Sequence, residues 1–329
     1  MENKLDLSRW RETPRGIGYR RWTIVSAGLR QLLRTRFLRI LLVIAWSMGL
    51  AIAAAGFVFS QSLATGGWLE TAAAHINARA EALVSVLGAF VIAYPDVCIG
   101  GFFTTLLWLH SFVGLWLSLL ALAAVVPQLI ARDRASNALT AYLARPLTSA
   151  DYLLGKLGIV AGVLALMWTG PLVFGWIVSM AFATDRDFVT YSLAPLVRAL
   201  AFNGVALVAL ATIALGVSAL GRSSRTAILM WIGLWLFFGF VAAPPRAPVW
   251  IQRASFTHDL GTVRQELFRL DRALASAADG LPLIDRQFAA NLAGAATAAK
   301  PADFSGALAS LAVLGGLSSL VFLRKLRPE

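Results

Sequence analysis

Six stretches of this chain carry no charged side chain over about 20 residues or more, which is the length that an α-helix needs to cross the ~30 Å hydrocarbon core of a bilayer. Only 14% of the 329 residues are charged and 58% are hydrophobic. Soluble domains have nearer ~25% charged residues, so an ordinary soluble globule is excluded. The sequence predicts an all-α integral membrane protein with six transmembrane helices.

The predicted organisation has three parts. Residues 1-39 are a cytoplasmic tail and an amphipathic interfacial helix, residues 40-323 are the six-span transmembrane domain, and residues 324-329 are a second cytoplasmic tail. The spans are expected at about 40-59, 104-127, 157-181, 199-220, 226-243 and 304-323, with external segments at 60-103 and 246-303. A shorter uncharged run, 82–95, covers only about two-thirds of a bilayer core as a helix and is expected at the interface.

The positions of the charged residues orient the chain. With the N-terminus inside, the inner segments hold 19 of the 29 Lys and Arg residues but only 6 of the 17 Asp and Glu residues. Cytoplasmic loops are enriched in Lys and Arg, so both termini are predicted to be cytoplasmic. The expected location is a bacterial-type cytoplasmic (inner) membrane, crossed several times. On such a protein the net charge of +12 reports orientation, and no nucleic-acid partner is expected.

Before the first span, apolar residues recur at helical spacing between Arg20 and Arg39, with arginines between them. This pattern predicts a basic amphipathic helix at the inner membrane surface, with membrane lipid as its partner. The residues expected at that interface are Trp22, Arg30, Arg34 and Arg36. A solvated helix is the alternative.

The longest external segment, 246-303, contains a second amphipathic pattern. Its apolar positions follow each other at intervals of three and four residues: Leu260, Val263, Leu267, Leu270 and Leu274. One helix of two to four turns, ended by Gly280, is predicted there. The segment is too short for an independent domain and is expected to form a cap or lid.

The most informative segment is the cytoplasmic stretch Pro127 to Lys156. It has helix-forming residues, a break at Arg145-Pro146, and the helix-start pattern Thr148-x-x-Asp151. A loop that only reverses the chain needs few residues, so this one is predicted to be a structured, charged protrusion that docks a cytosolic partner.

Within it, the 26 residues ARDRASNALTAYLARPLTSADYLLGK resemble the permease subunits of type-two ATP-binding-cassette transporters, an exporter-like family. The resemblance lies in the acidic-basic cluster, the Ala-Arg-Pro-Leu break and the Tyr-Leu-Leu-Gly-Lys start of the next span. It implies that Arg132 to Arg145 forms a coupling helix that fits a cleft on an ATPase subunit, and that two permease chains pair. The implied coupling residues are Arg132, Asp133, Arg134, Asn137, Leu139, Tyr142, Arg145 and Pro146.

The chain has no GxxxxGK[ST] phosphate-binding loop, because Gly155-Lys156 is followed by Leu157 and lacks the earlier glycine. It is therefore expected to be a transporter subunit and not an enzyme. No cofactor is expected on this chain; ATP and Mg would bind the partner ATPase subunit.

A few polar residues remain as candidates. His110 and Asn203 lie inside predicted spans and are candidate pathway residues, with interfacial solvation or helix packing as the alternatives. Arg198 is expected either to pair with external acids or to reach lipid phosphates. Gly158 and Gly162 form a GxxxG pair that is a weak signal for helix association. No catalytic residue stands out, and the three histidines and one cysteine lack metal-ligand spacing.

Two other functions stay open. The chain can be a non-transporting membrane scaffold or assembly factor that binds a partner through 246-303, or a membrane enzyme, which the scarcity of clustered polar residues disfavours. Spans rich in Leu, Ala, Gly and Trp suit a lipidic or amphipathic cargo, but composition does not separate this from peptides or drugs. The choice between a homodimer and a heterodimer is not in the sequence either.

Overall fold

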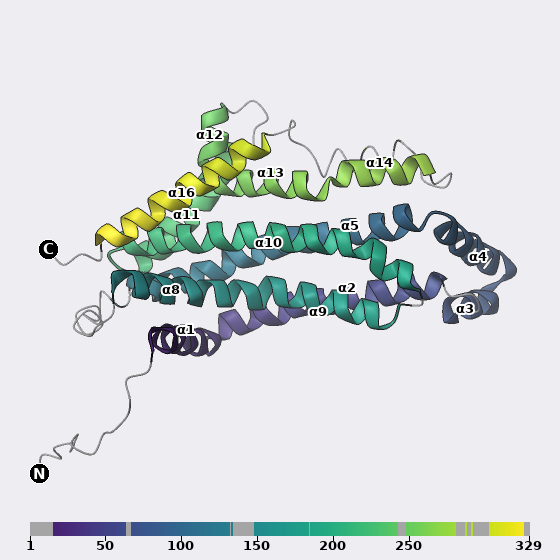
Figure 1. Ribbon diagram of the computed structural model, residues 1–329, viewed down its shortest axis with the longest axis horizontal. Helices are drawn as coiled ribbons and strands as arrows, with labels where there is room; N and C mark the ends of the chain where they lie inside the picture. The colour runs from purple at the N-terminus through teal and green to yellow at the C-terminus, as the bar shows by residue number, and fades with distance from the viewer. Residues whose placement is uncertain are drawn as a thin grey trace, which may run out of the picture.

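The computed structural model describes residues 16–63, 67–131, 133, 148–183, 185–242, 248–280, 287, 291 and 303–325. Within these residues every regular element is a helix and none is a strand (Figure 1). This confirms the predicted all-α class. The elements in chain order are α1 (Ile17–Leu33), α2 (Arg36–Leu63), α3 (Trp68–Ile76), α4 (Ala78–Ala93), α5 (Pro95–Val126), η2 (Pro127–Ala131), α8 (Ser149–Leu164), η3 (Ala165–Thr169), α9 (Gly170–Ala181), α10 (Arg186–Leu220), α11 (Ser224–Ala242), α12 (Val249–Ala254), α13 (Phe256–Phe268), α14 (Leu270–Gly280) and α16 (Phe304–Lys325).

Six segments are long and apolar enough to cross a membrane, as predicted: Arg36–Gln61, Pro95–Ile130, Ala150–Ala181, Arg186–Leu220, Ser224–Ala242 and Phe304–Lys325. Five of them begin earlier than the apolar pattern indicates, and the differences are largest at Pro95, Ala150 and Arg186. Charged residues are tolerated once a helix leaves the hydrocarbon, so a charge-free criterion finds only the apolar part of a longer helix.

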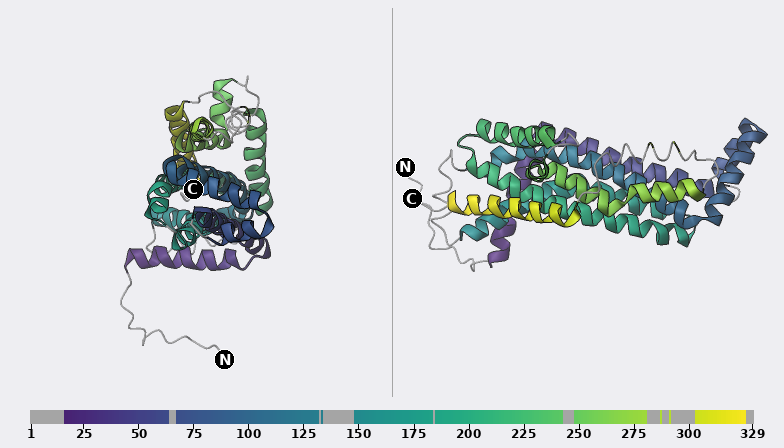
Figure 2. Two further views of the ribbon diagram at one scale, coloured as in Figure 1. Left: turned by 90° about the vertical axis from the view of Figure 1, so that its right-hand side faces the viewer. Right: turned by 90° about the horizontal axis from the view of Figure 1, so that it is seen from above.

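The spans lie side by side in a long bundle, and further helices lie at each of its two ends (Figures 1 and 2). At one end, which we call the α1 end, α1 lies across the bundle at a steep angle to the spans. At the opposite end, the α4 end, α3 and α4 extend beyond the bundle. A helix is thus present before the first span, as expected, and the short run 82–95 falls mainly in α4, which is not among the six candidate spans.

A seam of glycines on α8 receives α1. A Cβ added to Gly155 would lie 2.9 Å from Ile24, and one on Gly158 would lie 2.5 Å from Val25. Gly162 comes next along the seam and faces Leu29. Small residues allow two helices to approach closely. The GxxxG pair therefore has a packing role, and its partner is the helix across the end of the bundle and not another span.

The segment expected as one external helix is two helices, α13 and α14. Arg269 separates them with a left-handed φ of 47°, and its guanidinium donates a 3.0 Å hydrogen bond to Glu266. Two residues of the predicted apolar face, Leu260 and Val263, are fully buried, and so is Phe268, which the pattern did not include. They pack inside the chain against the main core, where α13 contacts α10, α11 and α16. This face is not available to another protein.

Charged residues also fix this segment to the bundle. Arg253 of α12 forms an ion pair with the fully buried carboxylate of Asp259, at 2.8 Å. Burial raises the pKa of Asp259 to about 6, with Arg253 acting in the opposite direction. The guanidinium of Arg264 lies over the rings of Trp108 and Phe112 of α5, 5.1 and 4.9 Å from their centroids. The segment 246-303 is therefore tied to the side of the bundle where it is described.

Candidate functional site

The protrusion singled out by the sequence enters from η2 and leaves into α8 at the α1 end. Of its predicted coupling residues only Asp133 is described; Arg132, Arg134, Asn137, Leu139, Tyr142, Arg145 and Pro146 lie outside the described residues. The structure does show the two places where the protrusion joins the bundle. We call Arg21, Asp133, Asp151, Tyr152 and Lys156 the junction.

The entry to the protrusion is a π-helical turn, η2, that ends the long helix α5. Ser218 of α10 spans this turn, since its hydroxyl donates to the carbonyl of Val126 at 2.7 Å and accepts from the amide of Ile130 at 3.1 Å. A π-turn leaves the regular hydrogen-bond ladder of a helix, and such turns are frequent at functional sites. The side chain of α10 restores the lost bonds, so the entry has a fixed geometry.

Asp133 connects the entry to the exit. Its carboxylate accepts a hydrogen bond from the Tyr152 hydroxyl at 2.6 Å and lies 2.6 Å from the Lys156 ammonium. The side chains of Lys156 and Asp133 are only 9% and 16% exposed. Hydrogen bonds to charged groups are about twice as strong as neutral ones. This contact therefore holds the chain just after η2 against α8.

The exit is fixed by the predicted helix start. Thr148 and Asp151 form both bonds of a capping box, with the Thr148 hydroxyl accepting from the Asp151 amide at 3.2 Å and the Asp151 carboxylate accepting from the Thr148 amide at 3.3 Å. The same carboxylate accepts from the Arg21 Nε at 2.8 Å. One acidic side chain thus begins α8 and holds α1 against it.

The two faces of helix α1 have different surroundings: one packs on α8 and the other is exposed. Its apolar residues Ile24, Val25 and Leu29 face the glycine seam, whereas Trp22 is 64% exposed. The predicted interface residues Arg30, Arg34 and Arg36 are also exposed. A cavity of about 250 Å³ remains between α1, η2 and α8, and Asp133, Tyr152 and Lys156 line part of it.

Four junction residues were not singled out as site residues by the sequence: Arg21, Asp151, Tyr152 and Lys156. Arg21 is 130 positions from Asp151, and Lys156 is 23 positions from Asp133. No local pattern joins residues so far apart. The capping box was the one available signal, because both of its partners lie within four positions.

The two candidate pathway residues are both buried inside the bundle, each 2% exposed. The Nε2 of His110 donates to the Trp168 carbonyl of the π-helical turn η3 at 3.2 Å, and Trp46 of α2 donates to Leu166 of the same turn at 3.1 Å. Neither amide atom of Asn203 has a hydrogen-bond partner among the described residues. The structure brings His110 to the third span but shows no bond between His110 and Asn203.

No metal centre emerges from the described part of the chain, in which no three His, Cys, Asp or Glu residues gather. The junction offers two cations and two carboxylates already paired with each other. The junction therefore connects α1, α8 and the chain that follows η2 through charged groups that are already paired. It is suited to holding these elements together and not to a reaction.

Comparison with known proteins agrees with this arrangement. Residues 22–325 match the family described as ABC-2 family transporter protein. No curated protein matches the chain. The match begins within α1, at residue 22, and ends with α16, so it includes all six spans, the segment 246-303 and every junction residue except Arg21. The chain is a multi-pass membrane protein that belongs to the ABC-2 transporter family, whose members are the permease components of ABC transporters.

Proposed function

We propose that this chain is the membrane-spanning subunit of an ABC exporter whose ATP is hydrolysed by a separate ATPase subunit. ATP and Mg bind that partner, and two permease chains form the substrate path. The α1 end faces the cytoplasm of a bacterial-type inner membrane. The charge distribution supports this orientation, because the segments at the α1 end carry most of the Lys and Arg residues.

The observation that carries the proposal is the junction. Partly buried ion pairs join Asp133, at the start of the predicted protrusion, to α8, and join α8 to Arg21 of α1. A push on the protrusion by an ATPase therefore moves α5, α8 and α1 together instead of bending a loose loop. Such coupling transmits free energy only if the ATPase contacts differ between two states of the permease.

Two π-helical turns give the moving spans places to deform. The turn η2 lies at the end of α5, and η3 interrupts the span that starts at Ala150. Alternation between states at η3 would change the neighbourhood of His110, which donates to this turn. His110 and Asn203 remain the proposed pathway residues, since both present unpaired polar atoms inside the bundle.

The experiment is a purification of the tagged full chain from its native membranes in a mild detergent, followed by identification of the proteins that accompany it. Wild-type chain should bring an ATPase subunit with it. The variant Asp133→Arg with Arg134→Asp should lose it, because the charge pattern of the protrusion is reversed. Arg222→Glu is the matched control, since Arg222 lies at the same end between α10 and α11.

A second variant separates loss of the partner from loss of the fold. Asp133→Lys with Lys156→Asp exchanges the two charges of the pair and should retain the thermal stability of the junction. If no ATPase accompanies the wild-type chain while it stays folded, the proposal is wrong. If the reversed variant retains the ATPase fully, the protrusion is not the coupling element.

A further inference from the structure

A cavity of about 330 Å³ opens at the α4 end between α5, α10 and α14. Polar side chains from all three helices line it: Asp96, Thr104, Thr190, Tyr191, Arg198 and Ser276. The wall on α5 also contains Gly100 and Gly101, and a Cβ on Gly101 would meet nothing within 4 Å. The missing side chains leave the space open.

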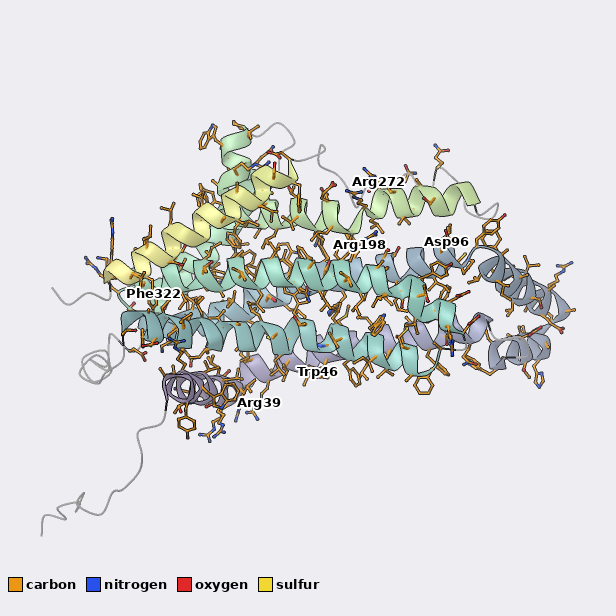
Figure 3. All side chains as sticks on the ribbon, in the orientation of Figure 1. Arg39, Trp46, Asp96, Arg198, Arg272 and Phe322 are labelled. Atoms are coloured by element: carbon orange, nitrogen blue, oxygen red, sulfur yellow. The ribbon has the colours of Figure 1, made fainter. Side chains whose placement is uncertain are left out.

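The charges of this cavity do not neutralise each other. Arg198 forms no ion pair with Asp96, Asp185 or Asp187, and none with any other residue in the ranges the structure describes. Arg272 is also without an ion-pair partner there, and it precedes Ala273 of the cavity wall. Figure 3 labels Arg272 on α14 above Arg198 on α10, with Asp96 nearer the α4 end. Arg198 is thus a cation in the cavity wall with no acid bound to it among the described residues, whereas Arg272 is not part of that wall.

The depth of Arg198 in the membrane follows from its place in α10. It lies 22 residues before Leu220, the last residue of that helix at the α1 end. At about 1.5 Å per residue this is roughly 33 Å, slightly more than the ~30 Å hydrocarbon thickness. Arg198 therefore lies where the phosphate groups of the far leaflet begin.

An apolar groove of about 530 Å³ continues from this level toward the α1 end, between α10 and α16. Its α10 wall includes Val205, Ala209 and Thr212, which are 7, 11 and 14 positions after Arg198. Residues at these intervals share one face of a helix. The groove and Arg198 are therefore on the same side of α10, and the facing wall of α16 is apolar apart from Ser319.

We propose that these two cavities form one binding site for an amphiphile with a phosphate headgroup. The phosphate binds Arg198 at the interface, and an apolar chain lies in the groove between α10 and α16. Arginine binds phosphate through paired N–H donors, and free hydroxyls in the wall such as Thr104 add further contacts. The carboxylate of Asp96 at the outer end accepts a hydrogen bond from an amine or hydroxyl in the rest of the headgroup. The site does not depend on ATP coupling, so it can be tested apart from the transporter proposal.

The first test titrates the full chain in maltoside detergent with dioctanoyl phosphatidylglycerol and counts bound molecules by native mass spectrometry. Glycerol phosphate supplies the headgroup without chains, and dioctanoylglycerol supplies the chains without phosphate. The phospholipid should bind at least tenfold more tightly than either fragment. Equal binding of dioctanoylglycerol would show that phosphate is not recognised. Equal binding of glycerol phosphate would show that the ligand is a soluble phosphate and that the groove takes no part.

Variants then test each half of the site. Arg198→Gln should weaken phospholipid binding at least tenfold, whereas Arg186→Gln, at the start of the same helix, and Arg272→Gln, outside the cavity wall, should not. Gly204→Phe should fill the groove and also weaken binding, while Gly233→Phe on α11 should not; a Cβ at either glycine meets nothing within 4 Å. Equal losses in the test and control variants would mean that the lipid responds to general surface charge or bulk, and would overturn the proposal.

Discussion

The two ends of the bundle use charged side chains in opposite ways. At the α1 end, Arg21 and Lys156 are each paired with a carboxylate whose side chain is 8% or 16% exposed. At the α4 end, Arg198 and Asp96 line one cavity without forming an ion pair. Paired charges in a packed setting join helices, and unpaired charges beside a cavity are left for a ligand. The comparison suggests that the α1 end transmits force and the α4 end meets a small molecule.

Removal of a partner from the junction gives the largest expected effect. Lys156→Met leaves the Asp133 carboxylate shielded and without its cation, which costs on the order of 3 kcal/mol of unfolding free energy in buried pairs. Thermal unfolding in detergent should show a clear fall in Tm. The double variant Lys156→Met with Asp133→Asn should recover most of it, since Asn still accepts from Tyr152. Failure to recover would mean that the lysine stem, and not the ion pair, stabilises the junction.

The glycine seam gives the next largest effect. In Gly158→Ala the new Cβ would lie 2.5 Å from the Cγ2 of Val25, whose branched side chain has few alternative rotamers. Overpacking of this kind costs about 1–3 kcal/mol, so Tm should fall and α1 should become easier to cleave with protease. Gly101→Ala in the α4-end cavity is the control. It meets no atom and should be neutral or stabilise by up to ~1 kcal/mol.

The pH dependence of stability should reveal Asp259. Its carboxylate is fully buried and forms an ion pair with Arg253, whose side chain is 22% exposed. Burial raises its pKa from 3.8 to about 6, so the folded chain holds an extra proton between these values. Its contribution to the unfolding free energy therefore falls as the pH rises from about 4 to about 6, and is constant above that. The Tm difference between wild type and Asp259→Asn, measured from pH 4.5 to 7.5, should change below pH 6. A flat difference would contradict the shift.

The smallest stability effect is expected at the α4-end cavity. Arg198→Gln removes an exposed side chain with no ion-pair partner in the described residues, so the unfolding free energy should change by no more than about 0.5 kcal/mol. Thermal unfolding under the same conditions as for Lys156→Met measures this directly. A large fall in Tm would show that Arg198 supports the fold and would remove the contrast between the two ends.

The sequence predicted the elements well where the physical cause is local. The amphipathic pattern of Arg20 to Arg39 predicted α1, which begins at Ile17 and already ends at Leu33, and Thr148-x-x-Asp151 predicted the start of α8. It erred at Arg269, because the apolar spacing continues through this position and residues 262–274 contain no Gly or Pro to signal the left-handed turn. The π-turns η2 and η3 were also missed, since they depend on Ser218, Trp46 and His110 from other helices.

The number of spans and the distribution of positive charge follow from the amino-acid sequence alone, because the bilayer acts as a solvent on each segment separately. The pairing of Asp133 with Lys156, the docking of α1 on the glycine seam and the cavity beside Arg198 are different in kind. Each joins side chains from helices far apart in the chain, so it depends on how the bundle packs. Tertiary packing places Arg21 and Lys156 of the α1 end in partly buried pairs, and within the described residues it leaves Arg198 and Asp96 of the α4 end without an ion pair.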